Sequence, residues 1–368
     1  MTYDLQLKTA NALALLKGKI AIPACSGAEA AAAGYLEACL AAAGAAPFRI
    51  GNNVCAYSKS YSKGKKSLLL NSHIDTVKAA DGYTMNPFEP VEKNGKLYGL
   101  GANDAGASLV ALVETFLHFN TLELPFNLLL VLSSEEENSG AAGIASVTRE
   151  IKDMDSAVIG EPTLMKAATG ERGLLVLDGT AHGATGHAAR NEGVNAIYGA
   201  MEDIAAIRDY TFDRVSPLMG EVKKNVTMIN AGYQHNVIPD CCRFVVDVRP
   251  NECYTNREIL ELLQAGVKSE LKARSLHNRC SFTPAGHPLL QCVERLAIPT
   301  FISPTTSDWM RLDIPAIKMG PGDSARSHTA DEFVYIHEIE EGIKGYIRFI
   351  SQLSHLTNNH SSSLISNS

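Results

Sequence analysis

Two uninterrupted apolar runs, LLLNSHI at 68–74 and FNLLLVLSS at 126–134, mark the first half of the chain. Turn-forming residues bound both runs, a pattern typical of strands buried on both faces of a sheet. Residues 105–119 and 139–151 instead have helical spacing, and a third strand follows at 156–160. This alternation predicts an α/β fold with a mixed, mostly parallel sheet flanked by helices.

The pattern changes between about residue 170 and residue 283. Stretches such as ERGLLVLDGTAHG and NVTMINAGYQHNVIPDCCRFVVDVRP alternate apolar and polar positions around turn residues, and helical spacing appears near 192–208 and 255–271. Such alternation is typical of an antiparallel sheet with one face in solvent. We therefore expect an inserted α+β domain with an antiparallel sheet and two helices.

After residue 284 the pattern of the first half returns, with a buried strand at 315–320 and a closing helix near 337–353. The simplest topology is one α/β domain interrupted by a smaller one. We expect a catalytic domain of residues 1–168 and 284–355, an inserted domain of residues 169–283, and a polar tail of residues 356–368.

Composition narrows the class of protein. The 368 residues are 45% hydrophobic and carry a net charge of −7, without a run of Lys and Arg, which argues against a nucleic-acid partner. No stretch approaches the ~18 apolar residues of a membrane span. The eight Cys residues are scattered without a CxxC pair, and the N-terminus shows no signal-peptide cleavage site. We expect a cytoplasmic protein that binds neither nucleic acid nor membrane.

Acidic and histidine residues gather where the predicted strands end. His73 and Asp75 stand two apart, so their side chains project to the same side, and an Asp in this place commonly orients a metal-binding His. The second strand ends in SSEEEN, which contains Glu135 and Glu136, and the third is followed by Glu161. The carboxyl ends of strands are where open α/β folds place their sites.

The loop GLGANDAG at 99–106 looks like a phosphate-binding loop but carries Asp104. Its glycine spacing does not match the dinucleotide fingerprint, and a carboxylate would occupy the place of the pyrophosphate. Asp104 is therefore either the N-cap of the following helix or a ligand for a cation. His328, in SHTADE after the last buried strand, is the second candidate histidine.

Each of these residues alone has an ordinary explanation as a structural hydrogen bond, a helix cap or a solvated turn. Together, imidazole and carboxylate groups suit zinc, manganese or cobalt. Three carboxylates and one hydroxide balance the charge of two divalent cations, which favours a two-metal hydrolytic site. The expected ligands are His73, Asp104, Glu136, Glu161 and His328.

The motifs HID, PFEP, NGKLYGLGAND, SSEEEN, GEPT and SHTADE together resemble the co-catalytic di-zinc family of acetylornithine deacetylase, succinyl-diaminopimelate desuccinylase, aminoacylase and carboxypeptidase G2-like enzymes. The resemblance covers nearly the whole chain, since GHAARNEGVNAI and NVIPD…DVRP match the dimerisation domain of that family. It implies two Zn²⁺ per subunit, with Co²⁺ or Mn²⁺ as alternatives, and a homodimer formed through the inserted domain.

The resemblance also implies how the ligands divide between two metals. Asp104 bridges them. His73 and Glu161 complete one site, and Glu136 and His328 complete the other.

Three further residues take catalytic roles by the same resemblance. Glu135 is the general base that takes a proton from the bridging water, and Asp75 orients His73. His187 reaches the active site of the partner subunit and helps to stabilise the oxyanion. One departure is plain: the family usually has Asp-x-Lys-Gly after the bridging Asp, whereas this chain has no lysine at 104–107.

Recognition of an amino-acid substrate requires groups that bind its carboxylate and side chain. Arg249 and Asn236 match the family motifs, and Gly322 and Arg326 lie in the loop GPGDSAR. Asp308 is a candidate partner for a cationic, ornithine-like side chain.

The expected reaction is hydrolysis of an N-acyl amino acid by a metal-bridged hydroxide, with a Glu as general base. N-acetyl-L-ornithine, an intermediate of arginine biosynthesis, is the first candidate substrate. N-acetyl- or N-succinyl-citrulline remains open, as does a di-/tripeptidase or aminoacylase activity. A catalytically silent, metal-stabilised dimer that acts as a binder is the alternative outside enzymes.

Overall fold

The computed structural model describes residues 4–190 and 192–365. The chain divides into two compact units. The first consists of Met1–Thr169, Phe282–Phe301 and Ser307–Ser368, and the second of Gly170–Ser281 and Ile302–Thr306.

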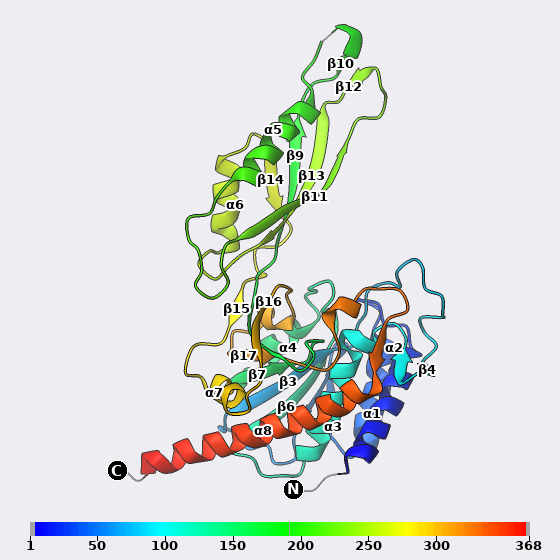
Figure 1. Cartoon of the computed structure of the whole chain (residues 1–368), viewed down its shortest axis with the longest axis vertical. Helices are drawn as coiled ribbons and strands as arrows, with labels where there is room; N and C mark the ends of the chain where they lie inside the picture. The colour runs from blue at the N-terminus through cyan, green and yellow to red at the C-terminus, as the bar shows by residue number, and fades with distance from the viewer. Residues whose placement is uncertain (1–3, 191, 366–368) are drawn as a thin grey trace. The chain divides into compact units, whose positions relative to one another are not determined.

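A mixed sheet of nine strands lies at the centre of the first unit (Figure 1). Its strands are β1 (Pro47–Ile50), β2 (Asn53–Tyr57), β3 (Ser67–His73), β6 (Asn127–Ser133), β7 (Ser156–Ile159), β8 (Ala167–Glu171), β15 (Ser281–Phe282), β16 (Thr300–Ser303) and β17 (Ala316–Lys318). They follow the order β1-β2-β6-β3-β7-β17-β8-β15, with β16 paired to β8. The central strands β6, β3, β7 and β17 are parallel, which confirms the predicted fold class.

The apolar side chains of the central strands pack into two cores, one on each face of the sheet. Leu68 and Leu70 of β3 belong to the larger core, and Leu69 between them belongs to the smaller one. The larger core is covered by α1 (Leu5–Ile20), α2 (Ala30–Ala42), α3 (Ala107–Phe119), α7 (Pro288–Arg295) and α8 (Ile336–Ile365). The smaller core lies under α4 (Ile144–Glu150) and the 3-10 turn η3 (Asp308–Arg311).

The closing helix α8 runs further than the sequence pattern indicates. It continues to Ile365, so most of the segment predicted as a polar tail is helical, and residues 366–368 lie outside the described residues. Leu353 and Leu356 are buried in the core. Because these contacts anchor a formed helix and no Gly or Pro follows, each further residue is added at little cost despite its poor propensity.

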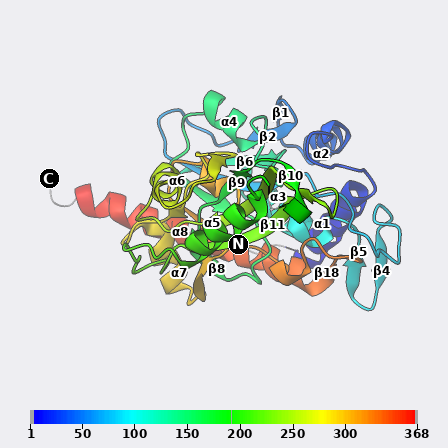
Figure 2. The ribbon, with the colours of Figure 1, turned by 90° about the horizontal axis from the view of Figure 1, so that it is seen from above.

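The second unit is built on an antiparallel sheet of four strands, β9 (Leu175–His182), β11 (Lys223–Ala231), β13 (Cys241–Arg249) and β14 (Glu270–Ala273), in the order β11-β13-β9-β14. Helices α5 (Ala196–Asp209) and α6 (Asn256–Ala265) lie on the same side of it (Figures 1 and 2). Alternate residues of β9 are buried, as the alternating sequence predicts. The second helix is shorter than expected, because Gly266 ends it and β14 follows.

Short elements complete the chain. Strands β4 (Val91–Lys93), β5 (Lys96–Tyr98) and β18 (Phe333–Tyr335) form a small sheet, and β10 (Gly186–His187) pairs with β12 (Val237–Ile238). Single helical turns are η1 (Ala102–Gly106), η2 (Ala188–Arg190) and η4 (Ser324–Arg326).

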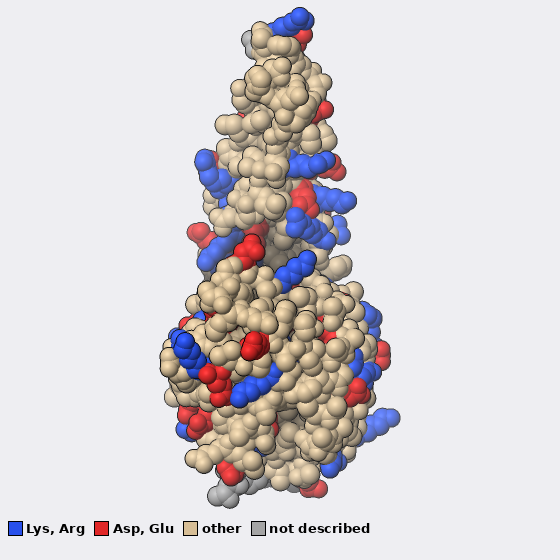
Figure 3. Space-filling model, turned by 90° about the vertical axis from the view of Figure 1, so that its right-hand side faces the viewer, with Lys and Arg blue, Asp and Glu red and all other residues tan. Residues whose placement is uncertain are grey.

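Helix length and surface charge are the two features of the described residues that bear on membrane and nucleic-acid binding. None of the helices in the described residues is both long and apolar enough to span a membrane. On the face drawn in Figure 3, basic and acidic side chains are interspersed, without a broad basic area. This mixture agrees with the net charge of −7.

Candidate metal centre

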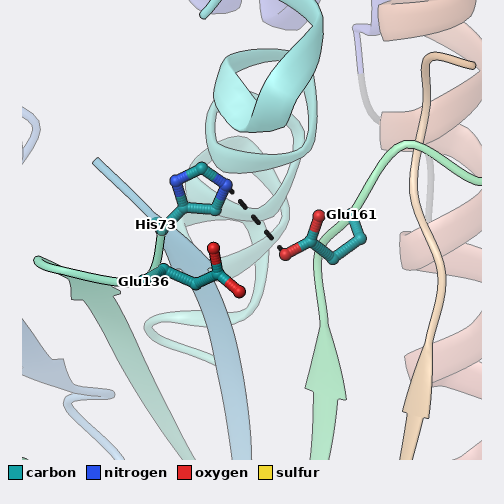
Figure 4. A group of neighbouring side chains, drawn as sticks. All are labelled: His73, Glu136 and Glu161. Carbon is teal, nitrogen blue, oxygen red and sulfur yellow. Dashed lines mark ion pairs between the residues drawn. The ribbon is translucent and has the colours of Figure 1, made fainter. Parts of the chain in front are cut away.

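The order of the central strands explains how distant residues meet. Strand β3 lies between β6 and β7, with His73 opposite Ser133 and Asn71 opposite Ile159. Because the three strands are parallel, the segments after them leave the sheet at one edge, where Glu136 lies next to His73 and Glu161 faces both of them (Figure 4). Ligand atoms of these three residues all lie within 4.8 Å of one another.

Asp104 connects this group with a second one. Its Oδ1 lies 3.3 Å from Nε2 of His73, and its Oδ2 lies 3.6 Å from Nε2 of His328. His328 in turn lies 3.0 Å from Oε2 of Glu137. The two oxygens of one carboxylate thus face two different sets of ligand atoms, which is the arrangement expected of a group shared by two cations.

The contacts of the three consecutive acids differ from the expected division of roles. The partner of His328 is Glu137, which the sequence reasoning left without a role, rather than Glu136. Glu135 points away from the cluster: its Oε2 accepts a hydrogen bond from the backbone N–H of Ala142 at 3.0 Å. The reason is local, because Glu135 adopts φ = 55°, and the alternation of side chains along β6 does not continue beyond the strand.

The glycines of the GLGAND loop allow it to approach α1 closely. A Cβ on Gly99 would lie 2.5 Å from Ile20 Cγ2, and one on Gly101 would lie 2.8 Å from Lys19 Nζ. Helix α3 has Gly106 at its N-cap and no side-chain cap, so Asp104 is not the cap of that helix. The loop therefore brings a carboxylate to the edge of the sheet.

Asp75 holds several parts of the centre together. His73 Nδ1 lies 3.0 Å from the carbonyl oxygen of Asp75 and 3.4 Å from its Oδ1, so this nitrogen carries the proton and leaves Nε2 facing the acids. The carboxylate also accepts hydrogen bonds from the Ser26 hydroxyl and from the backbone N–H groups of Glu136 and Glu137. Although burial opposes the shift, the bonds from His73 and Ser26 lower the pKa of Asp75.

The electrostatics of the cluster favour bound cations. Burial, joined by neighbouring carboxylates and opposed by His73, raises the pKa of Glu161 to about 8 and that of Glu136 well above its usual value. The hydrogen bond to Glu137 raises the pKa of His328 to about 9. Positive charge placed among these acids would offset both the burial and the mutual repulsion. A donor set of three shared or paired carboxylates and two imidazoles, held at 3.0–4.0 Å, fits a pair of divalent cations.

Three of the expected substrate residues lie in the first unit, and each has contacts within the protein. Asp308 is buried and accepts a hydrogen bond from the Ser133 hydroxyl, beneath the edge of the sheet. Arg326 forms a bidentate ion pair with Glu338, at 2.6 and 2.9 Å. At Gly322 a Cβ would lie 2.6 Å from Oδ1 of Asn103, so this glycine serves close packing.

The remaining candidates lie in the second unit. Arg249 forms a bidentate pair with Asp247, and Asn236 is exposed, with its carbonyl accepting a hydrogen bond from the N–H of Ala188. His187 is exposed at β10, where its Nδ1 accepts a hydrogen bond from the N–H of Ala189. His187 and Asn236 therefore keep free side-chain donors and acceptors, whereas Arg249 is already paired.

An imidazole and carboxylate cluster at the carboxyl edge of an α/β sheet suits a metal-dependent hydrolase centre. Comparison with known families gives the same class. The profile of peptidase family M20/M25/M40 matches residues 69–352, and the chain belongs to this family.

Individual relatives are similar at a lower level. The chain is 29% identical to an acetylornithine deacetylase of Proteus mirabilis over 300 residues, covering 75% of this chain and 77% of that protein. A tripeptidase of Staphylococcus aureus has the same fold, with a TM-score of 0.77 and 20% identity over 94% of this chain and 99% of its own. A dinuclear metal-binding M20 peptidase of Bacillus subtilis matches with a TM-score of 0.71 and 14% identity, covering 95% and 98%.

Proposed function

We propose that this protein is a metal-dependent amidohydrolase that removes the acyl group from an N-acyl amino acid and holds two Zn²⁺ per subunit. The observation that supports this best is the position of Asp104, whose two oxygens face His73 on one side and His328 on the other. A cluster with one cation would not require a carboxylate turned to two sets of ligands.

The proposed ligand sets are assigned from the distances between the imidazole nitrogens and the carboxylate oxygens. His73 and Glu161 hold one cation, Glu137 and His328 hold the other, and Asp104 is shared. When bound, such cations supply Lewis-acid activation of water and of an amide carbonyl. Co²⁺ or Mn²⁺ would suit the same nitrogen and oxygen donors.

Glu136 takes the role of general base in this proposal. It lies in the group with His73 and Glu161, and its backbone N–H is held by Asp75, while the neighbouring Glu137 is occupied by His328. A carboxylate in this position accepts a proton from the attacking water and returns it to the departing amine nitrogen. Glu135 cannot do so from its place over the loop at 140–142, where it is bonded to Ala142.

We also propose that the protein is a homodimer and that His187 acts in the active site of the partner. Strand β11 is an edge strand with exposed Met228 and Ile229, and α5 exposes Tyr198 and Met201. Exposed apolar side chains on a sheet edge and a nearby helix are typical of a subunit interface. The imidazole of His187 would donate a hydrogen bond to the oxyanion of the substrate carbonyl.

N-acetyl-L-ornithine is the first candidate substrate, because the acetylornithine deacetylases of Proteus mirabilis and Shigella sonnei are 29% and 28% identical to this chain. The enzyme would then act in arginine biosynthesis in the cytoplasm. A citrulline derivative is the second candidate, since Asp308, the residue expected to bind a cationic side chain, is buried against Ser133. The neutral side chain of citrulline has no need of that acid.

A substrate panel with metal analysis tests the proposal. Purified protein is assayed for amine release from acetyl and succinyl derivatives of ornithine, citrulline and diaminopimelate, and from di- and tripeptides, while bound metal is counted per subunit. We expect two divalent ions and the fastest release from N-acetyl-L-ornithine. Two bound ions without release from any compound would favour a silent metal-stabilised binder, and preference for peptides would make the protein a peptidase.

A further inference from the structure

Lys19 is a lysine in an unusual place. It belongs to the last turn of α1, where basic residues are common because the helix dipole favours them. Lys17, in the same turn, fulfils that role at the surface, with its Nζ 2.8 Å from Oε1 of Glu92. Lys19 is instead only 1% exposed. A lysine so deeply buried requires charged or polar neighbours, since an isolated ammonium in a protein interior is strongly unfavourable.

The neighbours of Lys19 belong to the metal centre. Its Nζ lies beside Gly101, at 2.8 Å from where a Cβ of that residue would be. Burial lowers the pKa of Lys19, and four carboxylates oppose this shift, with Glu332 first, followed by Asp75, Glu137 and Asp104. The ammonium therefore lies beside the loop that carries Asp104.

Glu332 is the link between Lys19 and the shared ligand. Its carboxylate is 2% exposed and accepts hydrogen bonds from the backbone N–H groups of Gly101, Asn103 and Asp104, at 3.0, 2.8 and 2.9 Å. These three bonds fix the turn that presents Asp104. Gly101 links the two groups, since its N–H donates to Glu332 and Lys19 Nζ lies beside its Cα, so the positive charge of Lys19 stands near this buried carboxylate.

Position 106 of the loop cannot carry that charge. Gly106 stands where the related Asp-x-Lys-Gly motif has its lysine. A Cβ at Gly106 would lie 2.2 Å from the carbonyl oxygen of Gly101 and 2.6 Å from Cδ1 of Leu16, so no side chain fits without movement of the backbone. The space beside Gly101 is filled from α1 instead.

We propose that Lys19 is a positioning residue of the metal centre, which balances the charge of Glu332 and, through it, holds the turn that presents Asp104. This inference rests on the proposed function in assigning Asp104 to the cations. It gives α1, the most N-terminal helix, a part in organising a site whose other residues begin at β3.

The sign of the effect on metal binding separates this role from a simple electrostatic one. If Lys19 acted only as a positive charge near two cations, its removal would strengthen their binding. If it holds Asp104 in place through Glu332, its removal weakens their binding. Lys19→Met keeps the length and apolar volume of the side chain, and Lys17→Met, on the same helix turn, is the matched control.

The first experiment measures metal retention without any substrate. Protein loaded with Zn²⁺ is titrated with a chelator, and the metal that remains bound is counted. We expect Lys19→Met to release metal at about one-tenth of the chelator concentration that the wild type requires, a tenfold change in line with other residues that orient ligands. Lys17→Met should match the wild type. Unchanged or tighter binding in Lys19→Met would overturn the proposal.

The second experiment is a double-mutant cycle on thermal unfolding of the protein freed of metal by chelation, so it requires neither metal nor catalysis. Lys19→Met should lower Tm, because it leaves Glu332 as a buried and unbalanced carboxylate. Adding Glu332→Gln, which removes that charge and keeps an acceptor oxygen, should recover part of the loss. If the decrease in Tm of the double variant equals the sum of the decreases of the two single variants, Lys19 does not act through Glu332. A wild type that binds no metal would refute the proposed function while this cycle still decides the pairing.

Discussion

The carboxylate of Asp75 accepts a hydrogen bond from the backbone N–H of Glu136, over 3.1 Å. The same side chain orients the ring of His73 from strand β3, so one buried acid couples the ends of two neighbouring strands. A displacement of Asp75 would therefore disturb a proposed metal ligand and the proposed general base together.

Asp75→Asn is the first test of this coupling. The amide can still accept one bond, but it loses the charge that favours the orientation of His73, so we expect metal affinity and kcat each to fall about 10–100-fold. Asp153→Asn is a suitable control, because Asp153 also accepts side-chain hydrogen bonds, from Tyr57 and Tyr61, without contact with the centre. Wild-type kinetics in Asp75→Asn would remove this residue from the mechanism.

The assignment of the general base is tested by exchanging neighbours. Glu136→Gln should lower kcat by about 10²–10⁴-fold, the usual contribution of a general base, with both metals retained. Glu135→Gln should change kcat only a few-fold, because its carboxylate is bonded to the backbone N–H of Ala142. Steady-state kinetics and metal counts on both variants provide the measurement. If Glu135 were the base, Glu135→Gln would lower kcat far more than Glu136→Gln.

Metal stoichiometry tests the two ligand sets. Glu137→Ala removes the carboxylate that lies 3.0 Å from His328, so we expect one of the two ions to be lost or bound far more weakly. Asp104→Ala removes the shared carboxylate and should weaken both. Equal stoichiometry of Glu137→Ala and wild type, measured by elemental analysis after dialysis, would contradict the assignment of Glu137 as a ligand.

Much of this centre could be predicted because its residues directly follow regular strands. His73 is the last residue of β3, and Glu161 comes two residues after β7, so strand order alone brings them to one edge. Asp104 and His328 lie in loops, and there the prediction depended on the chemistry of acids and imidazoles rather than on geometry.

The register of the three acids could not be predicted for a physical reason. The direction of a side chain alternates reliably only while the backbone stays extended, and Glu135 leaves that region at φ = 55°. Lys19 was missed because a lysine in the last turn of a helix is ordinarily solvated. Its burial depends on Gly99 and Gly101, which lie some eighty residues away in the chain and let the loop approach α1.

The proposed dimer makes a prediction about mixed subunits. Glu136→Gln should lack its general base, and His187→Ala should fail to complete the partner's site, so each variant alone should be nearly inactive. A mixed dimer would contain one site with both Glu136 and the partner's His187. Unfolding and refolding an equal mixture should therefore restore about a quarter of wild-type activity, because half of randomly formed dimers are mixed and each has one complete site. No gain on mixing would indicate that His187 acts within its own subunit or not at all.

Removal of metal should lower the stability of the first unit in a way that depends on Asp104. Without cations, the partly buried carboxylates of Glu136, Glu161 and Asp104 all lie around His73, and part of the folding free energy is spent on their repulsion. Ligands that bind only the folded state stabilise it by about 2.7 kcal/mol at a hundredfold excess over Kd. We expect Tm to fall on chelation and to recover when Zn²⁺, Mn²⁺ or Co²⁺ is added, as followed by calorimetry. The Tm of Asp104→Asn should respond less to added metal. Because this variant has one fewer charge in the cluster, its Tm should also fall less on chelation. A wild-type Tm that does not respond to chelator or metal would show that the acids are accommodated without cations, and the two-metal proposal would then fail.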